Sequence, residues 1–280
     1  MSRILIVSLL GAVVISGCET AGDGKGDVTL NLEATQGARS FLRTAITGVP
    51  VTDSNGLSAG TIDLTDAWVV VKEIEFEHED DEETADSDQS KLEFIGPYAV
   101  DLLTGTTYPA LPQISIDTGL YTDIEIDIEK LSASDVAGMT GLDSAIATKL
   151  ENYSIYLDGT YNDGVNTIDF TLMYDQTDEF EFSPAGVSSN GFNIDDEGIN
   201  DILVAFRLNE WFRFDNAETN NGLSVDFSDA VSGTDPIVLD ANTNSDVMDV
   251  IEDNIEDSAE YGEDDNDDGV LSDDEDDNDD

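Results

Sequence analysis

The stretch YTDIEIDIEK, residues 121–130, alternates isoleucines with acidic residues at every second position. Ile124, Ile126 and Ile128 therefore lie on one side of an extended chain and the acids on the other, because side chains of a β-strand alternate between its faces. A helix would not gather the three isoleucines into one stripe. The segment predicts a strand with one buried and one solvated face, which is stable only when it packs against other strands.

The same period of two recurs along the chain. The even-numbered residues from Trp68 to Phe76 are predicted to share one face, and Glu73, Glu75 and Glu77 the other. Turn signals of the Asp-Gly and Asn-Gly type separate or follow the remaining candidates. Further strands are predicted over residues 91–95, 153–161, 166–174, 178–183 and 201–208.

Several short strands, each with one apolar face, must close against one another to bury those faces. We therefore predict a mainly β chain, folded as an antiparallel β-sandwich of the immunoglobulin or transthyretin kind, with a short C-terminal helix. An up-and-down β-barrel is the alternative, because it buries the same pattern by closing one sheet on itself. Residues 132–150 have a helical pattern that two internal glycines weaken.

The net charge limits the classes of partner. The chain has 64 acidic and 10 basic residues, for a formal net charge of -54. Such a chain repels nucleic acids and anionic membrane surfaces, which excludes both as ligands, and it attracts cations. Because salt screens its self-repulsion, we expect a marine or halophilic source. An unusually acidic exported protein from an ordinary source is the alternative.

The chain contains one cysteine and one histidine. A single cysteine excludes a disulfide framework. A single histidine makes a Ser-His-Asp triad or a multi-histidine zinc site hard to build. That histidine, His78, is expected to be a solvated residue at the end of a strand, beside the acidic run 79–83.

The amino terminus reads MSRILIVSLLGAVVISGC, with an apolar run over residues 4–15 and the small pair Ser16-Gly17 before Cys18. The apolar run is too short to span a bilayer stably and is typical of a signal-peptide core. Ile-Ser-Gly-Cys resembles the bacterial lipobox, in which the cysteine receives diacylglycerol and becomes the acylated amino terminus. We predict a signal peptide over residues 1–17 and a palmitate-type membrane anchor on Cys18, with an ordinary signal and a chance cysteine as the alternative.

Four segments resemble a family of bacterial surface lipoproteins built on a β-sandwich domain of unknown function: IDLTDAWVVVKEIEFEHE, YAVDLLTG, LPQISIDTGLYTDIEIDIEKL and FNIDDEGINDILVAFRLNEWF. The resemblance covers about residues 60–215. It departs from the family pattern at Trp68, where the family has proline, and at residues 117–119, where it has Pro-Ala-Gly. The resemblance implies an exported β-sandwich, and it implies no catalytic residues.

Catalysis is only weakly indicated. A glycosidase needs two carboxyl groups across one sugar, one of them in an apolar setting. Among 64 acidic residues some pair meets that distance by chance. The segment LNEWFRF, residues 208–214, carries three aromatics and is either a stacking surface for sugars or a core anchor at a strand end. We predict that the protein is not an enzyme and has no catalytic residue, with a carbohydrate-active enzyme as the alternative.

Residues 264–275, DDNDDGVLSDDE, fit the EF-hand loop D-x-[DN]-x-[DN]-G-x5-E throughout. That loop requires a glycine at position 6, an apolar residue at position 8 and a bidentate glutamate at position 12. These are Gly269, Leu271 and Glu275 here. A plain acidic tail is the alternative. We predict one calcium ion, bound by Asp264, Asn266, Asp268, the Val270 carbonyl, Ser272 and Glu275.

A helix is predicted ahead of this loop, over residues 245–260, with Ser245 as its N-cap. Its acidic carboxyl end opposes the helix dipole, which a cation just beyond would offset. The exiting helix of an EF-hand is missing. The apolar stripe of the predicted helix consists of Met248, Ile251, Ile255 and Ala259.

These features predict a lipid-anchored, exported binding or structural module of the cell envelope, with an unknown surface protein or glycan as its ligand. Glu19 follows the cysteine, where an aspartate favours inner-membrane retention in enteric bacteria, so we expect the outer membrane. A tether is predicted over residues 18–26 and the β-sandwich domain over 27–240. The helix and acidic tail are predicted over residues 241–280.

Overall fold

A computed structural model of the chain describes residues 24–35, 45–78, 91–182, 192–195, 199–216, 225–256 and 258–263. Two of the sites predicted from the sequence lie outside the described residues. They are the lipidation site at Cys18 and the calcium loop with Asp264, Asn266, Asp268, Val270, Ser272 and Glu275.

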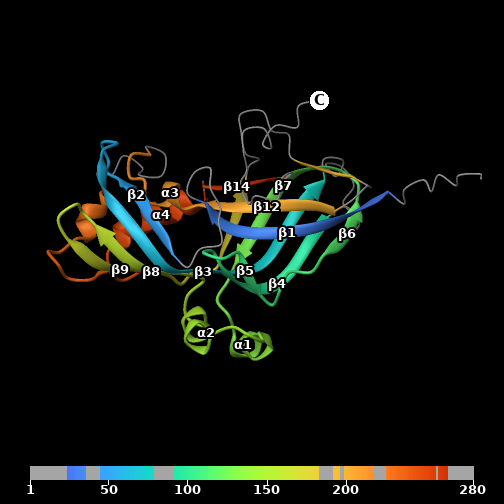
Figure 1. Cartoon of the computed structure of the whole chain (residues 1–280), viewed down its shortest axis with the longest axis horizontal. Helices are drawn as coiled ribbons and strands as arrows, with labels where there is room; N and C mark the ends of the chain where they lie inside the picture. Colours follow the sequence, from blue (N-terminus) through green and yellow to red (C-terminus); the bar gives the residue numbers. More distant parts are fainter. Residues whose placement is uncertain are drawn as a thin grey trace, which may run out of the picture.

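Two β-sheets form the body of the molecule (Figure 1). The smaller sheet has the strand order β14-β12-β1-β6, and it consists of Ala259–Glu263, Ile199–Arg207, Lys25–Thr35 and Ile114–Asp117. The larger sheet has ten strands, with the central order β10-β7-β3-β8-β9-β13. Those six are Asp178–Phe182, Gly119–Ile128, Ser58–His78, Ile155–Asn162, Thr167–Tyr174 and Ile237–Leu239. Its other strands are β2 (Ile46–Thr52), β4 (Lys91–Asp101), β5 (Thr106–Tyr108) and β11 (Phe192–Ile194).

The 21-residue strand β3 joins the two halves of the larger sheet. Its first half pairs with β2 and β8, and its second half pairs with β4 and β7. Figure 1 shows the small sheet over the half that contains β4 and β7. The helices α3 (Leu208–Trp211) and α4 (Ser245–Glu256) lie over the other half, next to the 3₁₀ helix η2 (Phe227–Ala230). One continuous apolar core fills the space under both covers.

The predicted sandwich is confirmed, and both sheets are open rather than closed into a barrel. Ile124, Ile126 and Ile128 are buried in the main core, as their alternation predicts. The sheets are not purely antiparallel, however: β1 pairs in parallel with β12, and β9 with β13. Each of these partners lies far along the chain from the other, so no hairpin turn dictates their direction.

The predicted sharing of one face by the even-numbered residues from Trp68 to Phe76 is wrong. Before Lys72, Val69 and Val71 enter the main core, whereas after Lys72 it is Ile74 and Phe76 that enter it. A register shift between Val71 and Glu73 inserts Lys72 as an extra residue relative to β7. An extra residue in one strand exchanges its two faces, because the side-chain period is two.

The helical segments also differ from their prediction in detail. Residues 132–150 form two short helices, α1 (Ala133–Gly138) and α2 (Ser144–Leu150), because the chain turns between them at Gly141, with φ of 97°. Helix α4 starts at Ser245, so Ser245 is its first residue rather than a cap that precedes it. The buried stripe of α4 includes Met248, Ile251 and Ile255, as predicted.

The predicted helix over residues 245–260 ends early, at Glu256. Ala259, expected on the helical stripe, instead begins β14, which pairs antiparallel with β12 and extends the small sheet to Glu263. The side chains of α4 belong to the same core as the strands. Residues on both sides of the predicted domain end at 240 therefore pack into one body.

Candidate functional site

The outer face of the larger sheet, turned away from β1 and β12, is divided at the Lys72 bulge. Before the bulge, the outward side chains Trp68 and Val70 form a second apolar cluster with Leu131, Met139 and Leu150. These last three come from α2 and from the segments that flank α1, and Figure 1 shows both helices below this part of the sheet. The helices therefore shield the part of the outer face around Trp68 and Val70 from solvent.

Beyond the bulge, the outer face carries carboxylates. Glu73 on β3 lies opposite Asp127 on β7, and Asp127 lies opposite Glu179 on β10. In the next row, Glu75 lies opposite both Glu93 on β4 and Glu125 on β7. All six are partly or fully exposed. We call this surface the acidic half-face, and its members are Glu73, Glu75, Glu93, Glu125, Asp127 and Glu179.

The carboxylates of the acidic half-face lie close enough together to hold cations. In one group, formed by Glu73, Glu75 and Glu93, a carboxylate oxygen of each residue lies within 4.8 Å of the others. Glu125, Asp127 and Glu179 form a second group with the same spacing. Carboxylate oxygens at this separation suit calcium, which takes several oxygen ligands in flexible geometry, or the ammonium and guanidinium groups of a partner.

The neighbouring carboxylates repel the ionised form of Glu73. Burial raises the pKa of its carboxyl group, and the neighbouring carboxylates of Glu93, Asp127 and Glu75 raise it further. Like charges directly opposite each other destabilise a sheet. Lys72, at the bulge, forms an ion pair of 3.1 Å with Glu129, and its charge lowers the pKa of Glu73 by less than burial and the three carboxylates raise it. A cationic ligand would relieve the repulsion at Glu73.

An apolar pocket adjoins the acidic half-face. Ile95 on β4 lies directly opposite Glu73, yet 68% of it is exposed, although it stands within a strand. It lines a pocket of about 300 Å³ between β4 and α1, together with Pro97, Tyr98, Pro109, Asp135 and Met139. The pocket lies at the bulge, because Gly96 and Pro97, the two residues of β4 opposite Lys72, also line it.

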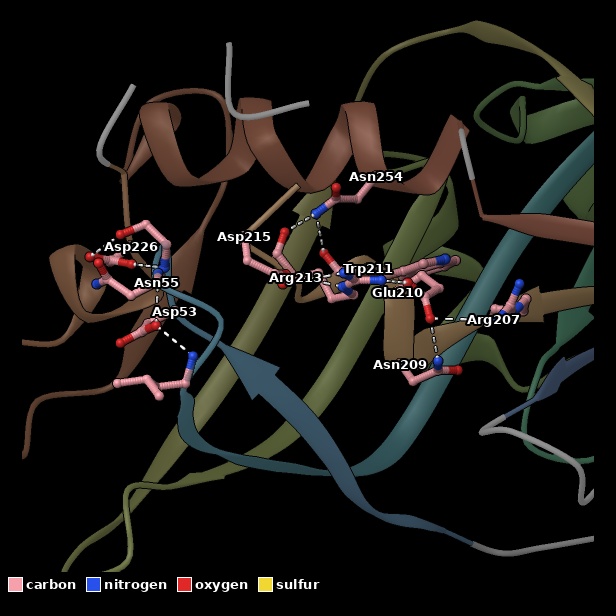
Figure 2. Close-up of polar contacts among 12 residues, drawn as sticks. Asp53, Asn55, Arg207, Asn209, Glu210, Trp211, Arg213, Asp215, Asp226 and Asn254 are labelled. Atoms are coloured by element: carbon pink, nitrogen blue, oxygen red, sulfur yellow. Dashed lines mark hydrogen bonds and ion pairs between the residues drawn. The ribbon is translucent and has the colours of Figure 1, made fainter. Parts of the chain in front are cut away.

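A second polar cluster lies beside α4 (Figure 2). Arg213 donates from Nη1 to Glu210 Oε2 at 2.8 Å and from Nε to Asp215 Oδ1 at 3.1 Å. These bonds to Asp215 and Glu210 raise the pKa of the Arg213 guanidinium. Asn254 donates from Nδ2 to the carbonyl oxygens of Trp211 and Arg213, at 3.1 and 2.7 Å.

This cluster has a structural explanation. Arg207 also contacts Glu210, at 3.6 Å, and a pocket of about 220 Å³ lies among these residues. Both arginines are paired with carboxylates, and Asn254 links α4 to the α3 segment through one buried and one partly buried hydrogen bond. Because Trp211, Phe212 and Phe214 are fully buried just beneath, the segment 208–214 is a core anchor, one of the two predicted alternatives, and not a stacking surface.

Asp178 and Glu252 are two acids that lie close together beside a pocket. The Tyr174 hydroxyl oxygen lies 2.5 Å from Asp178 Oδ2 and 2.8 Å from Glu252 Oε1, and Glu252 lines a pocket of about 300 Å³ with Met173 and Met248. A glycosidase directs its two carboxyls at opposite sides of a bound sugar. Here the carboxylate oxygens of Asp178 and Glu252 both point at the Tyr174 hydroxyl instead. These hydrogen bonds link α4 to the larger sheet.

His78, predicted at the end of a strand, is the last residue of β3. The exposure of Ile95 and the bulge beside it were not predicted. The signal was present in residues 91–95, KLEFI, where Phe94 is buried and Ile95 therefore falls on the side of Glu93. An isoleucine on the acidic side of an alternating strand is the pattern that could have revealed the pocket.

Among the described residues, no helix is both long and apolar enough to cross a membrane. Comparisons with protein-family models, with curated proteins and with solved structures gave no match.

Proposed function

We propose that this protein is an exported, lipid-anchored module of the cell envelope that binds a partner through its acidic half-face. The observation that carries the binding role is the half-face itself, where six carboxylates stand in register on an exposed part of the sheet. In-register like charges destabilise a sheet. A fold that keeps them gains stability from a partner that neutralises them.

The anchoring part of the proposal is supported by the spacing at the amino terminus. The only cysteine, Cys18, ends a lipobox-like sequence, and strand β1 begins at Lys25, seven residues later. A tether of that length spans at most about 25 Å. It would hold the sandwich close to the membrane surface, and several acyl chains on Cys18 would make the anchoring durable.

Metabolic labelling tests the anchor. In a bacterial host, the full chain should incorporate labelled palmitate, fractionate with membranes and lose its signal peptide. The Cys18→Ser variant should incorporate no label and should remain soluble or uncleaved. A Ser16→Ala variant keeps a small residue before the cysteine and serves as the control, which should be labelled normally. Palmitate incorporation that is unchanged in Cys18→Ser would contradict the anchor.

A further inference from the structure

We propose that the acidic half-face docks an extended cationic peptide segment of a partner protein, with one apolar side chain of that segment in the pocket beside Ile95. This inference rests on the proposed binding role of the half-face and names the chemistry of the partner. It has three supports: the exposed isoleucine, the charge that surrounds it and the spacing of the carboxylates.

The first support is the position of Ile95. Within the described part of the chain, three large apolar side chains are strongly exposed: Leu57 at 64%, Ile95 at 68% and Val165 at 88%. Leu57 and Val165 lie in the connections between strands, where exposure is ordinary. Ile95 lies within β4 and faces a pocket that Met139 also lines. Burial of these apolar surfaces by a partner would contribute to affinity.

The second support is charge complementarity around the pocket. Asp135 lines the pocket, Glu73 lies opposite Ile95, and Glu93 projects from the same side of β4 two residues away. An anionic segment would be repelled by these groups, and a neutral one would leave their mutual repulsion unchanged. A cationic segment would relieve it, and the chain's net charge of -54 would speed the encounter.

The third support is spacing. Glu73 and Glu75 are two residues apart along β3, as Asp127 and Glu125 are along β7, so successive rows stand about 7 Å apart. Alternate side chains of an extended peptide have the same spacing. A segment with an apolar residue followed by lysines at alternate positions would therefore place the apolar side chain in the pocket and its ammonium groups over the rows. A bare metal ion would make no use of the apolar pocket.

The test uses the full-length protein with Cys18→Ser and two synthetic peptides, Leu-Thr-Lys-Thr-Lys-Thr-Lys and the same peptide with serine in place of leucine. Affinities are measured by calorimetry at low salt. The leucine peptide should bind more tightly, and Ile95→Ser should weaken it roughly tenfold while leaving the serine peptide unchanged. Val165→Ser, which removes an exposed apolar side chain elsewhere, is the matched control and should change neither affinity.

The charge arm compares the double variant Glu73→Gln/Glu75→Gln with Asp169→Asn, an exposed acid on β9. The double variant should weaken both peptides, and Asp169→Asn should weaken neither. Loss of affinity in the double variant without any effect of Ile95→Ser overturns the docking proposal but leaves the half-face as a binding surface. No effect of the double variant overturns both. Displacement of both peptides by calcium, with no effect of Ile95→Ser, identifies an ion site and also overturns docking.

Discussion

The hydroxyl oxygen of Tyr174 on β9 lies 2.8 Å from Oε1 of Glu252 on α4, and the same oxygen lies 2.5 Å from Oδ2 of Asp178. A phenol has one proton and donates to one acceptor at a time. Both contacts are satisfied together when one carboxyl group carries a proton and donates it to the phenol oxygen. Burial raises the pKa of Glu252, and the carboxylates of Asp178, Asp249 and Asp253 raise it further, although the Tyr174 bond lowers it.

This arrangement makes stability depend on pH. Because the pKa of Glu252 is higher in the fold than its ordinary value of 4.5, the folded chain holds more protons than the unfolded chain just above that value. The contribution of Glu252 to stability is therefore present below about pH 4.5 and is lost as pH rises through the raised pKa.

Replacing the carboxyl group by an amide should remove this dependence. Glu252→Gln keeps the shape of the side chain and can still accept from Tyr174. We expect its melting temperature to exceed that of the natural protein by roughly 2 °C at pH 7 and to match it at pH 4. Glu151→Gln, at the end of α2, is the control. A lower melting temperature for Glu252→Gln at both pH values would show that the ionised carboxylate is the stabilising form.

The bulge at the pocket beside Ile95 depends on Gly96. A Cβ atom at this position would lie 2.6 Å from the Val71 carbonyl oxygen and 2.8 Å from that of Lys72. Gly96→Ala should therefore force the two strands apart and lower the free energy of unfolding by about 1–3 kcal/mol. Chemical denaturation measures this. Gly138→Ala is the matched control, because nothing lies within 4 Å of a Cβ there, and it should not destabilise the protein.

The same bulge explains which part of the fold could be predicted from the sequence. The alternation in residues 121–130 has no irregularity, so its buried face was correctly predicted from the period of two. In β3 the sequence alternates just as regularly. Because of the extra residue Lys72, however, Trp68 lies on the outer face and Ile74 on the inner face. The bulge arises from pairing with β4 and β7, and a single strand's sequence carries little information about its partners.

Long-range pairing limited the prediction elsewhere as well. Strand β1 pairs in parallel with β12 although more than a hundred residues separate them, and β14 joins the same sheet. The apolar pattern around residue 259 continues the helical period, so local sequence favours helix there. Pairing with β12 overrides it, because tertiary contacts outweigh local preference. The alternating acids of the acidic half-face can be read from the sequence of each strand. Which acids lie side by side depends on how β3, β4, β7 and β10 pair, and the sequence does not show this pairing.

The segment predicted to be a calcium loop, residues 264–275, comes directly after β14 in the sequence, because β14 ends at Glu263. This position ties the start of the predicted loop to the small sheet, since β14 pairs with β12. We expect a loop that the fold holds at its first residue only to bind calcium weakly, with a dissociation constant of about 10⁻⁴ to 10⁻³ M. Magnesium should compete poorly, because it requires a tight octahedron and releases its water reluctantly.

Calorimetry of the full-length Cys18→Ser protein tests this prediction. Glu275→Gln removes the bidentate ligand at position 12 and should abolish the site of one calcium ion per chain. Asp277→Asn removes the same charge two residues outside the loop and should leave the site intact. Because exposed acids elsewhere attract counter-ions diffusely, the titration is repeated in moderate salt, which screens diffuse attraction more than direct coordination. Equal binding by the two variants, or a signal that disappears in salt, would identify the segment as a plain acidic tail.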